Sequence, residues 1–169
     1  YANAAPLPPA SVSMQWTASD GSSSALGSSL VTIVPSNPAP AEWDGGAGTT
    51  NWSDAANWSN DTLPTVTDDV LITGATVTLS SGSYAVNTLT VVNGQVTIGG
   101  AALVVGNDAT DVSAFDDASQ LSLGSGTLTL GGYLNVDGTY TQTGGTLDGG
   151  GTLTLTGTGN TWSGSFSTW

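Results

Sequence analysis

Short apolar-x-apolar pairs recur in the C-terminal part of the chain with a spacing of 19 residues. Four sets follow this spacing: Val70, Val77 and Tyr84; Leu89, Val96 and Leu103; Leu121, Leu128 and Leu134; Tyr140, Leu147 and Leu153. Steps of six or seven residues within a set, punctuated by glycine, are typical of three short strands per turn. The pattern predicts an all-β fold, a single-stranded parallel β-helix (solenoid) over 70–169. We expect about four 19-residue coils, roughly 20 Å in total length.

The repeat loses its register between the second and third sets, where the next apolar pair arrives 13 residues late. The segment responsible is polar and lacks regular glycines, so we interpret 107–119 as a loop inserted between two coils. Insertions in repeat proteins gather on one face, which is often the working face. The segment carries four carboxylates: Asp108, Asp111, Asp116 and Asp117. They either bind one hard cation such as calcium or belong to a solvated loop.

Residues 1–42 differ in composition, with prolines near both ends and two apolar stretches between them. The first stretch alternates apolar and polar residues, and the second is a short continuous apolar run, so each is typical of a strand. The two stretches predict either a hairpin that packs on the N-terminal end of the solenoid or an arm that adds a strand to a neighbouring copy. The residues expected to mediate assembly are Val12, Met14, Trp16, Leu30 and Ile33.

Residues 43–69 contain three tryptophans, Trp43, Trp52 and Trp58, within 16 positions. A β-helix needs a cover on its first coil, because an open end exposes strand edges and core. We therefore expect 43–69 to form an N-terminal cap. The alternative is that the tryptophans form a platform on which sugar rings stack.

The stretch WDGGAGTTNWSDAANWSNDTLPTVTDDVLI resembles the opening of bacterial surface proteins with autotransporter-associated β-strand repeats. Residues 150–157 (GGTLTLTG) and 160–164 (NTWSG) are similar to the repeat itself, a G-x-L-x-L-x-G strand followed by an N-T-aromatic-S-G turn. The resemblance covers roughly 43–166. It implies an exported, right-handed β-helical protein, similar to an autotransporter passenger, with an adhesive or structural role. This chain is far shorter than most passengers.

The chain has no Lys, Arg, His or Cys, and its net charge is −13. Without cationic side chains, nucleic acid and anionic membranes are not expected partners. The composition also removes catalytic Ser-His-Asp, Cys-His and Lys chemistry, Cys/His zinc sites and disulfides. No apolar run approaches the ~20 residues that span a bilayer. Three explanations compete for the missing cations: selection for resistance to trypsin-like proteases, economy of nitrogen in an abundant secreted product, and excision of the chain from a precursor at basic residues. Each of them indicates a location outside the cell.

Paired carboxylates hydrolyse glycosides, which makes Asp68-Asp69 and Asp116-Asp117 worth weighing as catalysts. Adjacent strand residues point to opposite faces, and no basic residue is present to stabilise developing charge, so we expect no enzymatic activity. Thr and Ser dominate the expected outward positions, as in 127–129, 139–143 and 152–156. Such a face is either an ordinary solvent-exposed face of a sheet, a site of O-linked glycans, or a contact surface for a regular polysaccharide or an ice-like lattice.

The C-terminal end carries Trp162, Phe166 and Trp169. They either cap the last coil or form a sticky end that meets the Trp-rich end of the next molecule, and such a heterologous contact builds filaments. The leading hypothesis is a structural subunit of an extracellular filament or cell-surface layer, with itself as the head-to-tail partner. The alternative is a non-enzymatic adhesin or polysaccharide-binding module that uses Trp52, Trp58 and 107–119.

Overall fold

The computed structural model describes residues 10–19, 24–33, 39–163 and 165–166, and the chain divides into two compact units, 1–38 and 39–169. The first unit contains two antiparallel ten-residue strands, β1 (Ala10–Ser19) and β2 (Ser24–Ile33). The two strands expected in the N-terminal segment therefore pair with each other. The boundary lies earlier than the expected residue 42, because Ala41 already belongs to the core of the second unit.

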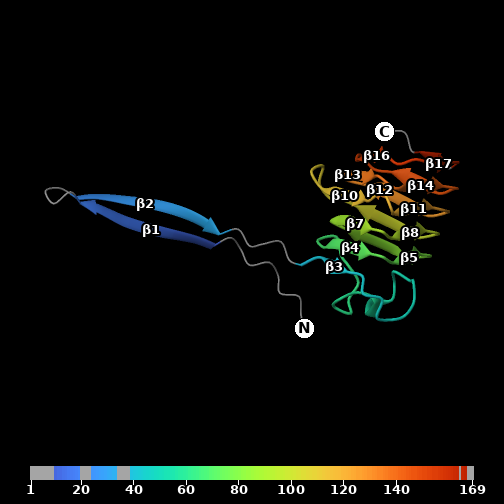
Figure 1. The fold of residues 1–169 in the computed structure, drawn as a ribbon, viewed down its shortest axis with the longest axis horizontal. Coiled ribbons are helices and arrows are strands. Elements are labelled where there is room, and N and C mark those ends of the chain that lie inside the picture. The colour runs from blue at the N-terminus through green and yellow to red at the C-terminus, as the bar shows by residue number, and fades with distance from the viewer. Residues whose placement is uncertain (1–9, 20–23, 34–38, 164, 167–169) are drawn as a thin grey trace. The chain divides into compact units, whose positions relative to one another are not determined.

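The second unit is a parallel β-solenoid of about five turns, and each turn contributes one strand to each of three sheets (Figure 1). The first sheet contains β3 (Ala41–Glu42), β4 (Asp69–Thr73), β7 (Thr88–Val92), β10 (Val112–Phe115), β13 (Tyr133–Val136) and β16 (Thr152–Leu155). The second contains β5 (Thr76–Leu79), β8 (Gln95–Ile98), β11 (Gln120–Leu123), β14 (Thr139–Gln142) and β17 (Thr161–Trp162). The third contains β6 (Ser83–Val86), β9 (Ala102–Val105), β12 (Thr127–Leu130), β15 (Thr146–Asp148) and β18 (Ser165–Phe166).

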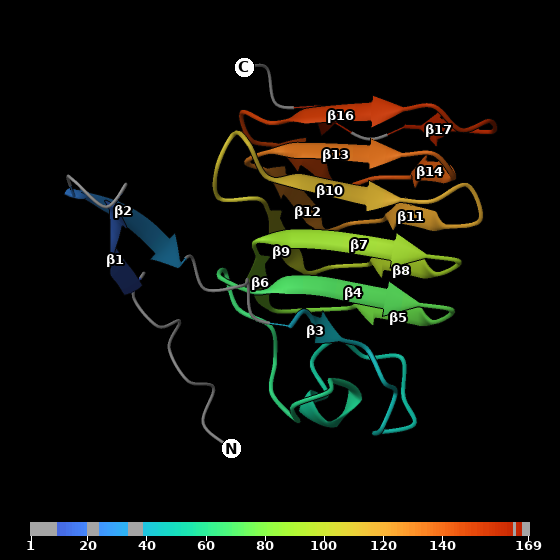
Figure 2. The ribbon, with the colours of Figure 1, turned by 60° about the vertical axis from the view of Figure 1, so that its left-hand side comes forward.

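The strands of one sheet lie directly above one another along the solenoid, as Figure 2 shows for β4, β7, β10, β13 and β16. Between β3 and β4 the chain forms one 3₁₀ turn, η1 (Ala55–Asn57), and irregular structure below the first coil. The described residues contain no helix long and apolar enough to cross a membrane.

Burial alternates along the strands with period two, because successive strand residues point to opposite faces of a sheet. The inward positions are mostly Val, Leu and Ile, and they stack into columns that run through the solenoid. Burying each such side chain contributes about 1.5–3 kcal/mol, so the stacked columns are the main source of stability in a chain without disulfides or ion pairs.

The 19-residue spacing is the true register of the solenoid on both sides of the break. Val70 pairs with Leu89, and Leu121 pairs with Tyr140. The other four predicted pairs are also found: Val77 with Val96, Tyr84 with Leu103, Leu128 with Leu147, and Leu134 with Leu153. The predicted parallel β-helix is confirmed.

The interpretation of 107–119 as one inserted loop is wrong, because its middle forms strand β10. Ala114 of this strand pairs with Thr90, 24 positions earlier, and with Asn135 of the next coil. Phe115 points inward and is buried in the core. The extra residues therefore lie mainly in the turn before β10, with one more at the corner after it. The solenoid has about five turns instead of the expected four.

Tight corners between the sheets leave no room for a Cβ atom at certain glycines. At Gly138, between β13 and β14, an added Cβ would overlap the backbone oxygens of Ser119 and Asp116 in the coil below. Corners stacked this closely explain why glycine recurs with the coil period.

Candidate functional site

The N-terminal end of the solenoid is closed by a cluster of tryptophan rings. The Trp58 ring packs edge-to-face on Trp52, with centroids 4.7 Å apart, and on Trp43, with centroids 5.1 Å apart. Its Nε1 donates a hydrogen bond of 3.0 Å to the backbone oxygen of Trp52. The Trp52 ring also lies 5.9 Å from Tyr84 of the first coil, so the cluster is continuous with the core. We call Trp43, Trp52 and Trp58 the tryptophan cap.

Burial of the tryptophan cap is inconsistent with a sugar-stacking platform. Trp52 and Trp58 are 0% and 1% exposed, and Trp43 is half-buried against the core. A sugar ring needs an open aromatic face, so Trp52 and Trp58 do not supply one in this structure. The proposed adhesin site at these residues is therefore corrected to a structural cover.

A buried amide, which the sequence did not single out, organises the loop that carries the cap. Asn57 is fully buried; its Nδ2 donates to Thr49 Oγ1 at 3.0 Å and to the backbone oxygen of Asn51 at 3.2 Å. Its Oδ1 accepts the Ala47 N–H at 3.0 Å. A buried polar group with all its partners in place fixes one conformation, because any rearrangement would leave its donors unpaired.

Backbone pairing also blocks two of the three sheet edges at this end. β3 pairs with β4 in the first sheet. In the second sheet, Thr78 N donates to the Thr50 oxygen at 2.7 Å and Trp52 N donates to the Thr78 oxygen at 3.0 Å. The N-terminal end therefore offers little free strand edge to another molecule.

The four aspartates considered for calcium do not converge on one point. Asp108 and Asp111 lie in the turn between β9 and β10, where Asp111 Oδ2 accepts the N–H groups of Asn107 and Asp108 at 2.9 and 2.8 Å. Asp116 and Asp117 lie beyond β10, at the next corner. In the described part of the chain, no group of three or more Asp or Glu side chains is placed to hold a metal ion. The structure thus favours the solvated-turn interpretation.

Two of these carboxylates, Asp108 and Asp116, are stabilised as anions by hydrogen-bond donors. Asp116 accepts the Ser119 hydroxyl and the Asn93 N–H, which lower the pKa of its carboxyl. The pKa of Asp108 is lowered in the same way by the backbone N–H and the hydroxyl of Thr110. Asp108 thus bonds within its own turn, and Asp116 connects the corner after β10 to Asn93 of the preceding coil.

The other carboxylate pair considered for catalysis is also occupied by local contacts. Asp68 Oδ2 accepts the Thr65 N–H at 2.8 Å and its hydroxyl at 2.7 Å. Asp69 Oδ1 accepts the Asn87 amide and the Thr88 hydroxyl, both at 2.8 Å. These contacts fit a structural role, and the absence of enzymatic activity stays a prediction.

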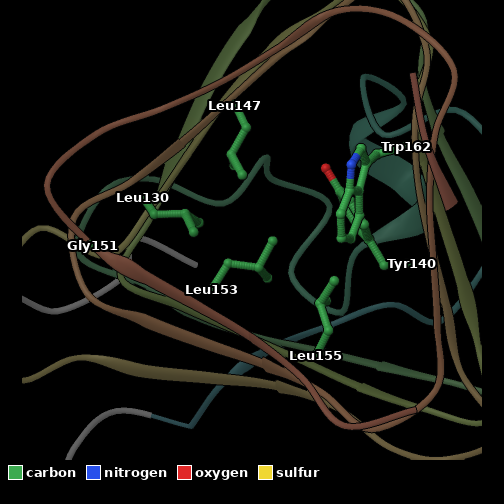
Figure 3. A pocket seen from close by; sticks show the side chains of 7 residues that line it. All are labelled: Leu130, Tyr140, Leu147, Gly151, Leu153, Leu155 and Trp162. Atoms are coloured by element: carbon green, nitrogen blue, oxygen red, sulfur yellow. The ribbon is translucent and has the colours of Figure 1, made fainter. Parts of the chain in front are cut away.

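The C-terminal end differs from the N-terminal end, because its last described coil surrounds an apolar pocket of about 280 Å³. Side chains from the last three coils point into it (Figure 3), and it is lined by Leu130, Tyr140, Leu147, Gly151, Leu153, Leu155 and Trp162. We call this pocket the C-terminal mouth. Trp162 is 59% exposed, and Leu153 and Leu155 are half-buried, whereas their counterparts in the first coil are buried.

A buried polar pair lies at the base of the C-terminal mouth. Tyr140 Oη lies 2.9 Å from Gln142 Oε1, to which it donates, and both residues are buried. Burial raises the pKa of Tyr140 to about 12, so the phenol is neutral over the whole physiological range. The apolar spacing identifies Tyr140 as a core position but gives no sign of this pair.

The remaining predicted assembly residues lie where only the backbone is described or outside the described residues. Val12, Met14 and Trp16 lie in β1, and Leu30 and Ile33 lie in β2. Phe166 lies in β18, and Trp169 falls outside the described residues. In the hairpin register Val12 pairs with Val31 and Ala10 with Ile33, whereas Leu30 pairs with Ser13.

Comparison with protein-family models gives no match, and comparisons with curated proteins and with solved structures give none either. The resemblance to autotransporter-associated repeats stays a prediction from the sequence.

Proposed function

We propose that this chain is a structural subunit of an extracellular filament or cell-surface layer. In this proposal the N-terminal hairpin of one copy covers the C-terminal mouth of another, which makes the contact head-to-tail. Such a heterologous contact does not close on itself, so repetition builds a filament.

The observation that carries the proposal is the contrast between the two ends of the solenoid. The N-terminal end has a buried tryptophan cap and paired edges, whereas the C-terminal mouth exposes Leu153, Leu155 and Trp162. In the described chain, β16, β17 and β18 are the outermost strands of their sheets at this end. Outermost strands around an apolar pocket are where another strand can be added.

Charge supports the hairpin as the partner of the mouth. Residues 149–169 contain no charged side chain, although the whole chain carries −13. The twenty residues of β1 and β2 contain none either. Like-charged copies repel one another, so contact is least costly between their neutral parts. Direct stacking on the opposite end would instead meet Glu42, Asp44 and other acidic residues of 42–69.

The experiment is sedimentation and negative-stain microscopy of the full chain over a range of protein and salt concentrations. We expect filaments whose formation increases with salt, because the screening length falls from about 30 Å at 0.01 M to about 10 Å at 0.1 M. Val12→Asp should abolish assembly, whereas Ser11→Asp, at the neighbouring position that pairs with Thr32, should have a weaker effect.

A second pair of variants tests the acceptor. Leu153→Asp charges the mouth, and Thr154→Asp puts the same charge at the adjacent outward position of β16. Only the first should prevent addition, and the thermal unfolding of both variants reports whether the fold is intact. Discrete monomers of the natural sequence at high protein concentration and high salt would refute the proposal.

A further inference from the structure

One face of the solenoid is made only of uncharged polar side chains. It is the outward face of the second sheet, and the register aligns its residues in two columns along the solenoid. One column is Thr76, Gln95, Gln120 and Thr139; the other is Thr78, Thr97, Ser122, Thr141 and Thr161. We call these nine residues the hydroxyl face.

The hydroxyl face is distinct from the two other faces in charge and in apolar content. The first sheet presents Asp69 and the exposed side chains of Val112 and Tyr133. The third sheet presents Asp148 together with Ala102 and Val104. A chain with 13 acidic residues thus leaves one complete sheet face free of charge. The corner next to it, at 80–82, 99–101, 124–126 and 143–145, is also uncharged.

The side chains of the hydroxyl face are available for an external partner. None of the nine takes part in a side-chain hydrogen bond with another group of the described residues, whereas hydroxyls elsewhere, such as Thr88 and Thr156, bond to carboxylates. Hydroxyl and amide groups each donate and accept, which complements the hydroxyl groups of sugars. Most of the nine are threonines, whose branched side chains have few rotamers, so little side-chain entropy is lost on binding.

We infer that the hydroxyl face binds the flat surface of an uncharged, extended polysaccharide such as a β-1,4-linked glucan. Neighbouring strands lie about 4.8 Å apart, so five strands present a regular array about 19 Å long, with about 6.6 Å between the two columns. Neutrality of the face matches a neutral polymer, and the net charge of −13 repels anionic ones. In the first column two glutamines stand between the threonines. Their longer amide side chains suit sugar hydroxyls better than they suit a rigid water lattice. This binding is independent of the proposed assembly.

The test is co-sedimentation of the full chain with microcrystalline cellulose. The first variant carries Thr97→Asp with Ser122→Asp, two residues paired in the centre of the hydroxyl face. The matched control carries Thr90→Asp with Ala114→Asp, a pair at the equivalent level of the first sheet. We expect at least a tenfold loss of binding in the first variant and little change in the control, with thermal unfolding measured on both.

Three results would overturn the inference. The first is that the natural sequence stays in the supernatant at every cellulose loading. The second is that both double variants lose binding equally, which would indicate general charge repulsion from the matrix. The third is that the natural sequence fails to bind cellulose but is incorporated into slowly growing ice, and that only the first variant loses this property. That result would assign the hydroxyl face to a water lattice. The Val12→Asp variant should bind cellulose as the natural sequence does, which separates this inference from the assembly proposal.

Discussion

Replacing Trp58 with alanine removes the centre of the tryptophan cap and measures how strongly the cap stabilises the solenoid. The ring is 1% exposed, packs edge-to-face on Trp43 and Trp52, and donates a hydrogen bond to a backbone oxygen. Truncation of a fully buried tryptophan costs about 3–5 kcal/mol through lost burial and the cavity left behind. Since a domain of this size has only about 5–15 kcal/mol of stability, the loss would be a large fraction of the whole.

The assay is urea unfolding of the full chain, followed by far-ultraviolet circular dichroism, which does not depend on the number of tryptophans. Trp162→Ala is the matched control, because this tryptophan is 59% exposed and should cost under about 1 kcal/mol. A 3–5 kcal/mol loss also corresponds to a fall of roughly 10–20 °C in the melting temperature.

A milder pair of substitutions separates packing from hydrogen bonding. Trp58→Phe loses the bond to the Trp52 oxygen, whereas Trp52→Phe removes an Nε1 group that is buried without a partner in the described chain. Because an unpaired buried donor is itself costly, Trp52→Phe should be the less destabilising by about 1–3 kcal/mol. If Trp58→Ala costs no more than Trp162→Ala, the cap does not close the solenoid and this account of the N-terminal end is wrong.

Three further predictions test the core, a corner and the buried phenol. Phe115→Ala should cost about 3–5 kcal/mol in urea unfolding if β10 is a true coil strand, whereas Val112→Ala, at an exposed position of the same strand, should cost under about 0.5 kcal/mol. Gly138→Ala should lower the melting temperature or prevent folding because its Cβ would overlap backbone, whereas Gly150→Ala meets open space and should be nearly neutral. The folded-state pKa of Tyr140, about 12, exceeds the ordinary 10.0, so its contribution to stability is complete below pH 10 and is lost as the pH rises toward 12. Between pH 9 and 12, the free energy of unfolding should therefore fall less steeply with pH in Tyr140→Phe than in the natural sequence. An unchanged slope would contradict the raised pKa of Tyr140.

The coil register could be predicted from the sequence because the inward positions of neighbouring coils are nearly all apolar. Val70 over Leu89 and Leu121 over Tyr140 follow directly from the 19-residue spacing. The three tryptophans that precede the first coil are buried or half-buried beside it, as expected of large aromatic side chains next to an open core.

Strand β10 could not be predicted in this way, because Ser113, the first of its two inward residues, is polar. Ser113 is buried and accepts the Leu89 N–H through its hydroxyl at 2.9 Å, while the apolar Val112 and Ala114 lie on the outward side. A search for apolar inward pairs therefore assigns Val112 and Ala114 to the inward side, which is the opposite of their position in the structure. The separate positions of Asp111 and Asp116 follow from the same strand, which stands between them.

The absence of cations explains where the acidic residues lie. Without Lys or Arg, the carboxylates are stabilised by water and by N–H and hydroxyl donors, and backbone N–H groups that take no part in strand pairing are found in turns. Asp111 and Asp116 accept backbone N–H groups at corners, and Asp68 accepts one before the first coil. Most of the charge is thereby confined to the corners and the N-terminal end. The second sheet and the C-terminal mouth are left neutral, and these are the two surfaces proposed for binding.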